Sequence, residues 1–153
     1  MNEELRALYQ EVIIDHGRHP RNFKKLEGYS CCQEAYNPLC GDRLTLYLKL
    51  DKDKILDASF EGGGCAISMA STSLMIERIK NTRISEAQQL FDSFHHLVTA
   101  PDSGADVSAP LGKLKVLGGV RDFPTRIKCA TLAWHALKAG LENVDHDKSV
   151  STE

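Results

Sequence analysis

The stretch LTLYLKLDKDKILDASFEGGG, residues 44–64, decides the fold of this 153-residue chain. Leucine recurs at every second position over 44–50, and this alternation predicts a strand with one buried face. Residues 51–53 have the composition of a turn, and apolar and polar side chains alternate again from Leu56 to Phe60. The two strands therefore form a predicted antiparallel hairpin. The three glycines that follow interrupt the strand pattern and lead into a helix.

Most of the remaining chain carries helical patterns. Apolar residues recur at helical spacing in several segments, and proline or glycine marks their ends. The predicted elements are helices over 2–15, 65–80 and 84–98, a short helix over 110–117, a last helix from Asp122 and Pro124 to about 143, a third strand over 30–36, and loops over 16–28 and 99–112.

These elements predict an α+β fold, in which a small antiparallel sheet of about three strands packs against several helices. We expect one domain over residues 1–144, because a chain of this length can bury its own core. The polar residues 145–153 are expected to form a disordered tail.

Composition and charge indicate a general class. Hydrophobic residues make up 42% of the chain, charged residues make up 26%, and the formal net charge is −2. This mixture is ordinary for a globular protein, and the nearly balanced charge argues against nucleic acid or a membrane surface as a partner. The charged N-terminal residues lack the apolar core of a secretion signal, and no apolar run approaches bilayer length. We therefore expect a cytoplasmic protein with no nucleic-acid or membrane partner.

The five cysteines are an odd number in a chain without a recognisable secretion signal. This argues against a disulfide framework and favours metal binding or thiol chemistry in a reducing compartment. Cys31 and Cys32 are adjacent, so in a strand one side chain faces the core and the other faces outward. We interpret this pair as structural rather than as a redox pair.

Cys40, Asp42, Cys65 and Cys129 form the candidate functional set. Each falls at a predicted loop or near the end of an element, where segments distant in the sequence can meet. Cys65 joins the glycine run to a predicted helix N-terminus, where the helix dipole and free N–H groups favour a thiolate. Three thiolates and one carboxylate can form a tetrahedral ligand set, and zinc suits them because it does not oxidise thiolates.

The spacing of these residues does not by itself decide whether they bind a metal ion. The chain has no Cys-x-x-Cys pair, and buried cysteines are common as small hydrophobic residues. Arg43, Arg126 and Lys128 adjoin the candidate ligands and would offset the net negative charge of a zinc ion with three thiolates and a carboxylate. The same three cations are equally well explained as solvated surface charges.

Three motifs taken together resemble the signature segments of the IscU/NifU N-terminal family of iron–sulfur assembly proteins. They are NPLCGD at 37–42, GCAISMAS at 64–71 and RIKCATL at 126–132, and they occur in the family's order. The chain is most similar to the SufU branch of this family. A long segment around 98–118 separates the second and third motif cysteines, and Lys128 stands where the iron–sulfur scaffolds carry a histidine.

The resemblance implies a zinc-dependent sulfurtransferase of iron–sulfur cluster assembly. In the SufU pattern Cys40, Asp42, Cys65 and Cys129 bind Zn²⁺, and Cys40 is also the nucleophile that accepts persulfide sulfur. The implied donor is a PLP-dependent cysteine desulfurase of the SufS type, and a histidine of that partner replaces Cys40 on the zinc ion. Arg126 is implied as a further catalytic residue that either stabilises the released thiolate or meets an acidic surface of the partner. A downstream iron–sulfur scaffold or another sulfur acceptor is the implied recipient.

Two alternative functions belong to other classes. The first is a scaffold on which an iron–sulfur cluster is transiently assembled, although the protonated Lys128 would be a poor ligand there. The second is a structural zinc domain that only activates the desulfurase.

Overall fold

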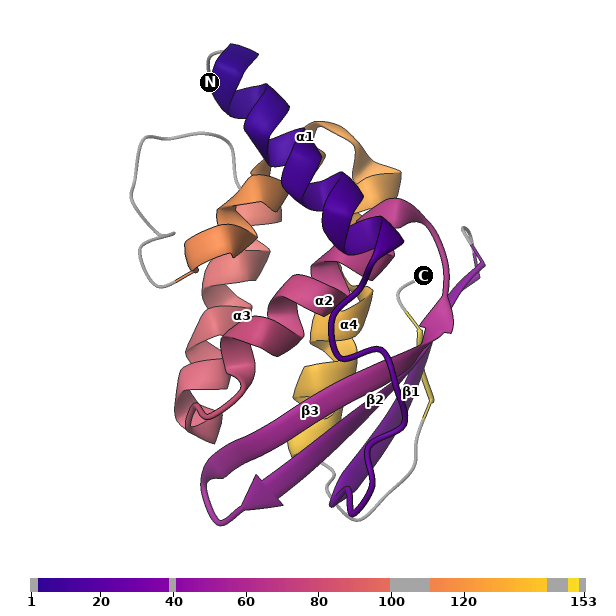
Figure 1. Ribbon diagram of the computed structural model, residues 1–153, viewed down its shortest axis with the longest axis vertical. Coiled ribbons are helices and arrows are strands. Elements are labelled where there is room, and N and C mark those ends of the chain that lie inside the picture. Colours follow the sequence, from indigo (N-terminus) through magenta and orange to yellow (C-terminus); the bar gives the residue numbers. More distant parts are fainter. Residues whose placement is uncertain (1–2, 39–40, 100–110, 143–148, 152–153) are drawn as a thin grey trace.

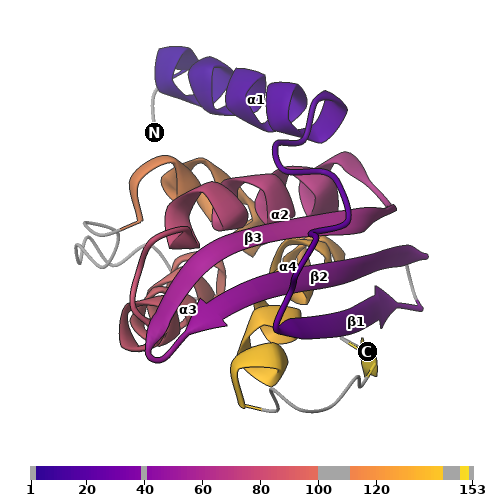
Figure 2. The same ribbon diagram turned by 60° about the horizontal axis from the view of Figure 1, so that its bottom comes forward.

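The computed structural model describes residues 3–38, 41–99, 111–142 and 149–151. The elements are, in chain order, α1 (Glu3–Arg18), β1 (Cys31–Asn37), β2 (Asp42–Asp51), β3 (Lys54–Gly63), α2 (Ala66–Ile79), α3 (Ile84–Thr99), the 3₁₀ helix η1 (Gly112–Asp122), α4 (Pro124–Glu142) and β4 (Ser149–Ser151). Helices α2, α3 and α4 gather on one side of the sheet, and α1 lies against α2 (Figures 1 and 2). The predicted α+β architecture is confirmed.

The sheet has the strand order β3-β2-β1-β4. β2 pairs antiparallel with both β1 and β3, which confirms the expected antiparallel three-stranded unit. β4 adds a short fourth strand parallel to β1, with Val150 opposite Ala35. The expectation of a disordered tail is therefore wrong for 149–151, where the backbone pairs with the edge of β1. The other residues of that predicted tail, 145–148 and 152–153, lie outside the described residues.

A β-bulge corrects the predicted second strand. Lys49 pairs with Asp57, but the next residue, Leu50, pairs with Ile55, so Leu56 is the additional residue. This extra residue reverses the inward and outward alternation at the start of β3. As a result Ile55 is fully buried, whereas Leu56, which the alternation placed on the buried face, is 39% exposed.

The core lies between the sheet and the helices. Phe60 of β3, Phe94 of α3 and Trp134 of α4 are almost completely buried, and the rings of Phe94 and Trp134 stack with centroids 4.6 Å apart. Stacked aromatic pairs add to the free energy gained from burying their area. This contact fixes the register of α3 against α4.

Two helices differ from their predicted bounds. α1 continues to Arg18, three residues beyond the predicted end, and Gly17 is part of it. A Cβ at Gly17 would lie 3.2 Å from the carbonyl oxygen of Ala66, so the glycine allows α1 to approach the start of α2 closely. The predicted short helix over 110–117 is observed as η1 and extends to Asp122. Of the predicted loop over 99–112, residues 100–110 lie outside the described residues.

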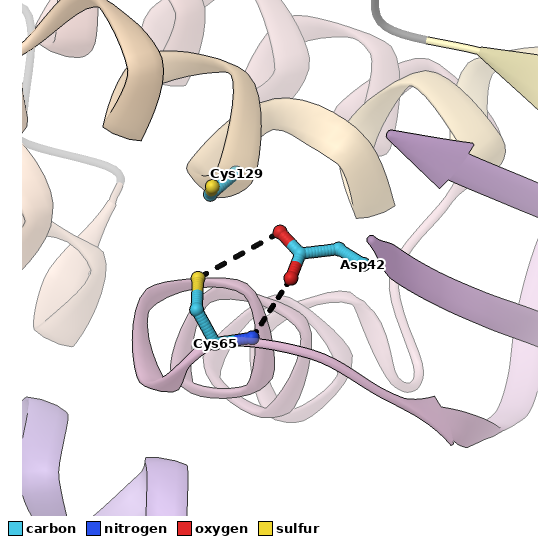
Figure 3. A group of neighbouring side chains, drawn as sticks. All are labelled: Asp42, Cys65 and Cys129. Atoms are coloured by element: carbon cyan, nitrogen blue, oxygen red, sulfur yellow. Dashed lines mark hydrogen bonds between the residues drawn. The ribbon is translucent and has the colours of Figure 1, made fainter. Parts of the chain in front are cut away.

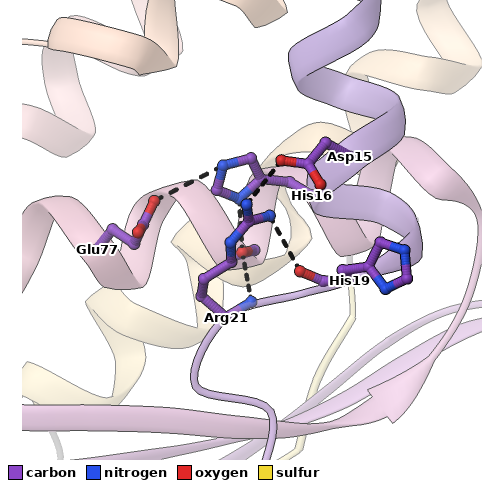
Figure 4. Close-up of polar contacts among 6 residues, drawn as sticks. Asp15, His16, His19, Arg21 and Glu77 are labelled. Atoms are coloured by element: carbon purple, nitrogen blue, oxygen red, sulfur yellow. Dashed lines mark hydrogen bonds and ion pairs between the residues drawn. The ribbon is translucent and has the colours of Figure 1, made fainter.

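A buried polar contact fastens the end of α1 to α2 (Figure 4). His16 is 3% exposed, and its Nδ1 lies 2.8 Å from the hydroxyl oxygen of Ser73. The same hydroxyl accepts a hydrogen bond from the backbone N–H of Arg21 at 2.8 Å, and Glu77 lies 3.7 Å from Nε2 of His16. Burial, with the nearby positive charge of Arg21, holds the pKa of His16 below its usual value. This side chain is therefore neutral at physiological pH.

None of the helices in the described ranges combines the length and the apolar character that a membrane crossing requires.

Candidate metal centre

Asp42, Cys65 and Cys129 converge where β2, α2 and α4 meet (Figure 3). Asp42 is the first residue of β2, Cys65 is the N-cap of α2, and Cys129 lies in the second turn of α4. One carboxylate oxygen and the two Sγ atoms all lie within 4.8 Å of one another. The structure thus brings together three of the four predicted ligands. The fourth, Cys40, lies outside the described residues.

The carboxylate of Asp42 is oriented by the backbone of its neighbour. Asp42 is fully buried, and its Oδ1 accepts a hydrogen bond from the backbone N–H of Cys65 at 2.8 Å. Its second oxygen, Oδ2, lies 3.7 Å from the Sγ of Cys65. A buried carboxylate needs partners of this kind, and one oxygen remains directed at the sulfur atoms. The carboxylate is therefore held in place with one oxygen available as a ligand.

Two of the three glycines before Cys65 allow this close approach. A Cβ at Gly64 would lie 2.4 Å from Oδ1 of Asp42, far inside contact distance. At Gly62, where φ is 144°, a Cβ would lie 2.2 Å from the carbonyl oxygen of Arg43. A Cβ at Gly63 would meet nothing within 4 Å. The sequence pattern predicted the run only as a strand breaker, so these separate roles were not predicted, although clustered glycines beside a candidate ligand are typical of close backbone approach.

Cys65 uses its sulfur as a helix cap. Its backbone is extended, with φ −71° and ψ 165°, and Sγ accepts a hydrogen bond from the backbone N–H of Ser68 at 3.4 Å. The first N–H groups of a helix have no partner within the helix, so this sulfur satisfies one of them. Cys65 is also the exposed member of the trio, whereas Asp42 and Cys129 are buried.

A buried hydrogen bond joins the two helices that carry the sulfur atoms. The hydroxyl of Ser71 in α2 donates to the backbone carbonyl oxygen of Ala130 in α4 at 2.5 Å. Ser71 is 1% exposed, and Ala130 directly follows Cys129. This bond limits how far the start of α4 can move from α2, and it was not anticipated from the sequence. Ser71, the last residue of the GCAISMAS motif, was the available signal.

The structure only partly supports the prediction that cationic side chains surround the candidate ligands. Arg43 and Arg126 are exposed, with their guanidinium groups 5.6 Å from the ring centroid of Tyr36 and 5.8 Å from that of Phe123. Within the described ranges, Arg126 makes no hydrogen bond or ion pair with Asp42 or Cys65. Cation–π contact near the protein surface is a modest interaction, so it does not lock these side chains in place. Lys128 is half-buried.

The donor set fits zinc. Metal–ligand bonds of about 2.3 Å to sulfur and 2.0–2.2 Å to oxygen, arranged tetrahedrally, require ligand atoms roughly 3.4–3.8 Å apart. The 3.7 Å between Oδ2 of Asp42 and Sγ of Cys65 lies in this range, and the limit of 4.8 Å for the trio requires only a small contraction. Two sulfur atoms and one carboxylate oxygen suit a thiophilic divalent ion. Among the described residues this is the one group of three or more such side chains arranged closely enough.

Comparison with a family model identifies the chain. The model described as the NifU-like N terminal domain matches residues 8–130, which run from within α1 to the start of α4 and include the trio. The chain belongs to the NifU-like N-terminal domain family. The expected resemblance to the IscU/NifU N-terminal family of iron–sulfur assembly proteins is thereby confirmed.

Relatives of this chain carry different descriptions. The chain is 45% identical over 140 residues to the "Zinc-dependent sulfurtransferase SufU" of Bacillus subtilis, covering 92% of this chain and 93% of that protein. It is 41% identical over 139 residues to the "Iron-sulfur cluster assembly scaffold protein IscU" of Streptococcus pyogenes, covering 91% of this chain and 86% of that protein. Both names therefore occur among relatives of similar identity.

A solved structure confirms the fold. The putative iron–sulfur cluster assembly scaffold protein for the SUF system from Fervidobacterium islandicum superposes with a TM-score of 0.79 at 34% identity, covering 92% of this chain and 99% of that one. The NifU-like N-terminal domain described above is thus a SufU- and IscU-like member of its family.

Proposed function

We propose that the protein is a zinc-dependent sulfurtransferase, a sulfur carrier in iron–sulfur cluster assembly. The observation that carries the proposal is the convergence of Asp42, Cys65 and Cys129 within 4.8 Å. The 45% identity to a relative named a zinc-dependent sulfurtransferase supports it. The proposal places the protein in the cytoplasm, because a reducing compartment keeps its thiols available.

In this proposal the trio and Cys40 hold the zinc ion. Cys40 is two residues before Asp42, so covalent geometry alone keeps their Cα atoms within about 7 Å. The N–H of Gly41 donates to the carbonyl oxygen of Asn37 at 2.8 Å, which closes the connection between β1 and β2 around this position. When bound, zinc keeps its thiolate ligands deprotonated and unoxidised at neutral pH.

The residues of the chain then divide the work. Asp42, Cys65 and Cys129 come from the start of a strand and two helices that are tied together by buried hydrogen bonds, so they are suited to a permanent holding role. Cys40 belongs to the short connection between β1 and β2 and is proposed as the nucleophile. Arg126 is proposed to stabilise the Cys40 thiolate, since its exposed guanidinium is free to leave Phe123.

The transfer is a thiol–disulfide type exchange. The Cys40 thiolate attacks the outer sulfur of a persulfide on the donor, and the sulfur–sulfur bond of the donor breaks as a new one forms on Cys40. The donor cysteine leaves as a thiolate, so no external oxidant or reductant is needed. We propose that the donor is a PLP-dependent cysteine desulfurase of the SufS type, and that the persulfide passes to an iron–sulfur scaffold or another acceptor.

A cluster scaffold is the second candidate function. Relatives that share 41% and 35% identity are named iron–sulfur cluster assembly scaffold proteins, which favours it. Lys128 counts against it, because this residue stands where the iron–sulfur scaffolds carry a histidine, and the lysine side chain is a poor iron ligand. Anaerobic reconstitution with iron and sulfide separates the two candidates. A stable cluster that transfers to an apo-protein would establish the scaffold and refute the zinc carrier.

The direct test combines metal analysis with sulfur transfer. The isolated protein should contain one zinc ion per chain, and incubation with a cysteine desulfurase and free cysteine should add one sulfur atom at Cys40, seen by mass spectrometry. Cys40→Ala should abolish this addition, while Cys32→Ala, a half-buried thiol in β1, serves as the matched control and should retain it. Undiminished sulfur uptake by Cys40→Ala would refute the assignment of the nucleophile.

A further inference from the structure

An open cavity lies between α3 and α4. Its volume is about 440 Å³, and it is lined by Phe91, Asp92, His95, His96, Thr99, His135 and Lys138. His135 follows Cys129 on α4 by six residues, which places it about 9 Å along the helix axis and about 120° around it. The cavity therefore opens on a different side of α4 from the metal centre.

One aromatic ring, that of Phe91, contacts three of the other side chains that line this cavity. The ring of Phe91 stacks with that of His95 at 6.1 Å between centroids and meets the ring of His135 edge-on at 5.5 Å. The ammonium group of Lys138 lies over the same ring at 5.1 Å. Phe94 and Trp134 form the stacked core contact between the same two helices. The cavity is thus lined by side chains of two packed helices rather than by a loop.

The nitrogen groups of this cavity are available to a ligand. Within the described part of the chain, the side chains of His95, His135 and Lys138 form no hydrogen bond or ion pair, and Asp92 is the only acidic residue in the lining. Burial first, and then the electrostatic effects of His95 and Lys138, lower the pKa of His135. The basic side chains of the lining therefore outnumber its one carboxylate, that of Asp92.

We propose that the cavity between α3 and α4 binds a small organic anion, a molecule that joins a phosphate or carboxylate group to a flat carbon body. The ammonium of Lys138 and the imidazole N–H groups supply charge-assisted hydrogen bonds to the anionic group. The ring of Phe91 and the faces of the imidazoles supply apolar contact for the body. The volume suits a small molecule, since ligand pockets begin at about 300 Å³.

Three histidines, His95, His96 and His135, could instead bind a metal ion, but their geometry argues against this alternative. The imidazoles and Asp92 do not place three ligand atoms within 4.8 Å of one another, whereas Asp42, Cys65 and Cys129 do. A transition metal would require the side chains to rearrange around Phe91. An anion needs only the donors that already face the cavity.

The test uses phenyl phosphate as the probe, with inorganic phosphate and phenol as controls that each carry one of its two features. Binding to the full-length, zinc-containing protein is followed by calorimetry, and the imidazole NMR signals of His95 and His135 report the location. Phenyl phosphate should bind about tenfold more tightly than either control, and the two imidazole signals should shift together on binding.

Variants make the test specific. Lys138→Ala and His95→Ala change exposed side chains and should each weaken phenyl phosphate binding about tenfold or more, as expected for a lost charged hydrogen bond. Lys115→Ala removes an exposed lysine of η1 and should leave binding unchanged, while Asp92→Asn should strengthen it. The proposal is overturned if Lys138→Ala binds as Lys115→Ala does, if phenol binds as tightly as phenyl phosphate, or if the imidazole signals do not move.

Discussion

The substitution Gly64→Ala tests how the metal centre is assembled, and its effect can be worked out from the structure. The new Cβ would lie 2.4 Å from Oδ1 of Asp42, and ordinary contact begins at 3.4 Å, so the carboxylate must retreat by about 1 Å. The hydrogen bond from the N–H of Cys65 is 2.8 Å long. A retreat along this bond would stretch it to about 3.8 Å, outside hydrogen-bonding range.

Two costs follow from this displacement. Forcing an extra methyl group into a packed site costs about 1–3 kcal/mol. Losing a hydrogen bond to a charged group costs about 1.5–3 kcal/mol. The two costs are not additive, because the carboxylate escapes the crowding only by moving away and so losing its hydrogen bond. We therefore expect Gly64→Ala to lower the free energy of unfolding of the zinc-free protein by about 2–4 kcal/mol. Zinc affinity should fall about 10–100-fold, because the displaced carboxylate no longer points at the two sulfur atoms.

Gly63→Ala is the matched control. It makes the same chemical change one residue earlier, where the Cβ meets nothing within 4 Å. Its unfolding free energy and zinc affinity should stay within about 0.5 kcal/mol of the parent values. Urea unfolding of the zinc-free proteins and competition with a chromophoric chelator measure the two quantities. If Gly64→Ala matched Gly63→Ala in both measurements, the claim that Gly64 seats the carboxylate would be wrong.

Three further predictions concern the site and its supports. Cys129→Ala should lose both zinc and thermal stability, whereas Cys40→Ala should lose sulfur acceptance but keep most of its stability; equal losses of melting temperature would contradict the division of roles. Ser71→Ala should cost about 1–2 kcal/mol in urea unfolding and also weaken zinc binding, because it releases the carbonyl of Ala130 and with it the start of α4; unchanged zinc affinity would limit the serine to a purely structural role. The pKa of His16 is lowered in the folded protein, so as the pH falls the unfolded chain takes up a proton first, near pH 6.5. Stability should therefore be full above about pH 7 and should fall as the pH drops through 6.5. His16→Gln should show a smaller loss of urea midpoint between pH 7.5 and 5.5 than the parent, and an identical loss in both proteins would exclude His16 as the cause.

Periodicity was a reliable guide where a single element determines its own pattern. The alternating leucines of 44–50 and the helical spacing in 65–80 and 84–98 predicted β2, α2 and α3 within a few residues, because side-chain direction repeats every two residues in a strand and every 3.6 in a helix. It was wrong at Leu56, where a bulge reverses the faces of β3. A bulge depends on pairing with another strand and leaves no mark in the local alternation.

For the metal centre too, some features follow from the sequence and others only from the tertiary structure. The sequence by itself determined the ligand chemistry, since cysteine and aspartate are the residue types that a thiophilic divalent ion uses, and their motifs determined the family. Only the tertiary structure decided that Asp42, Cys65 and Cys129 lie together, that Gly64 leaves room for the carboxylate, and that Ser71 ties α2 to α4. It alone placed 149–151 beside β1. The physical reason is that residue type is a local property, whereas distance between segments depends on packing and hydrogen bonds that form only when remote parts of the chain meet.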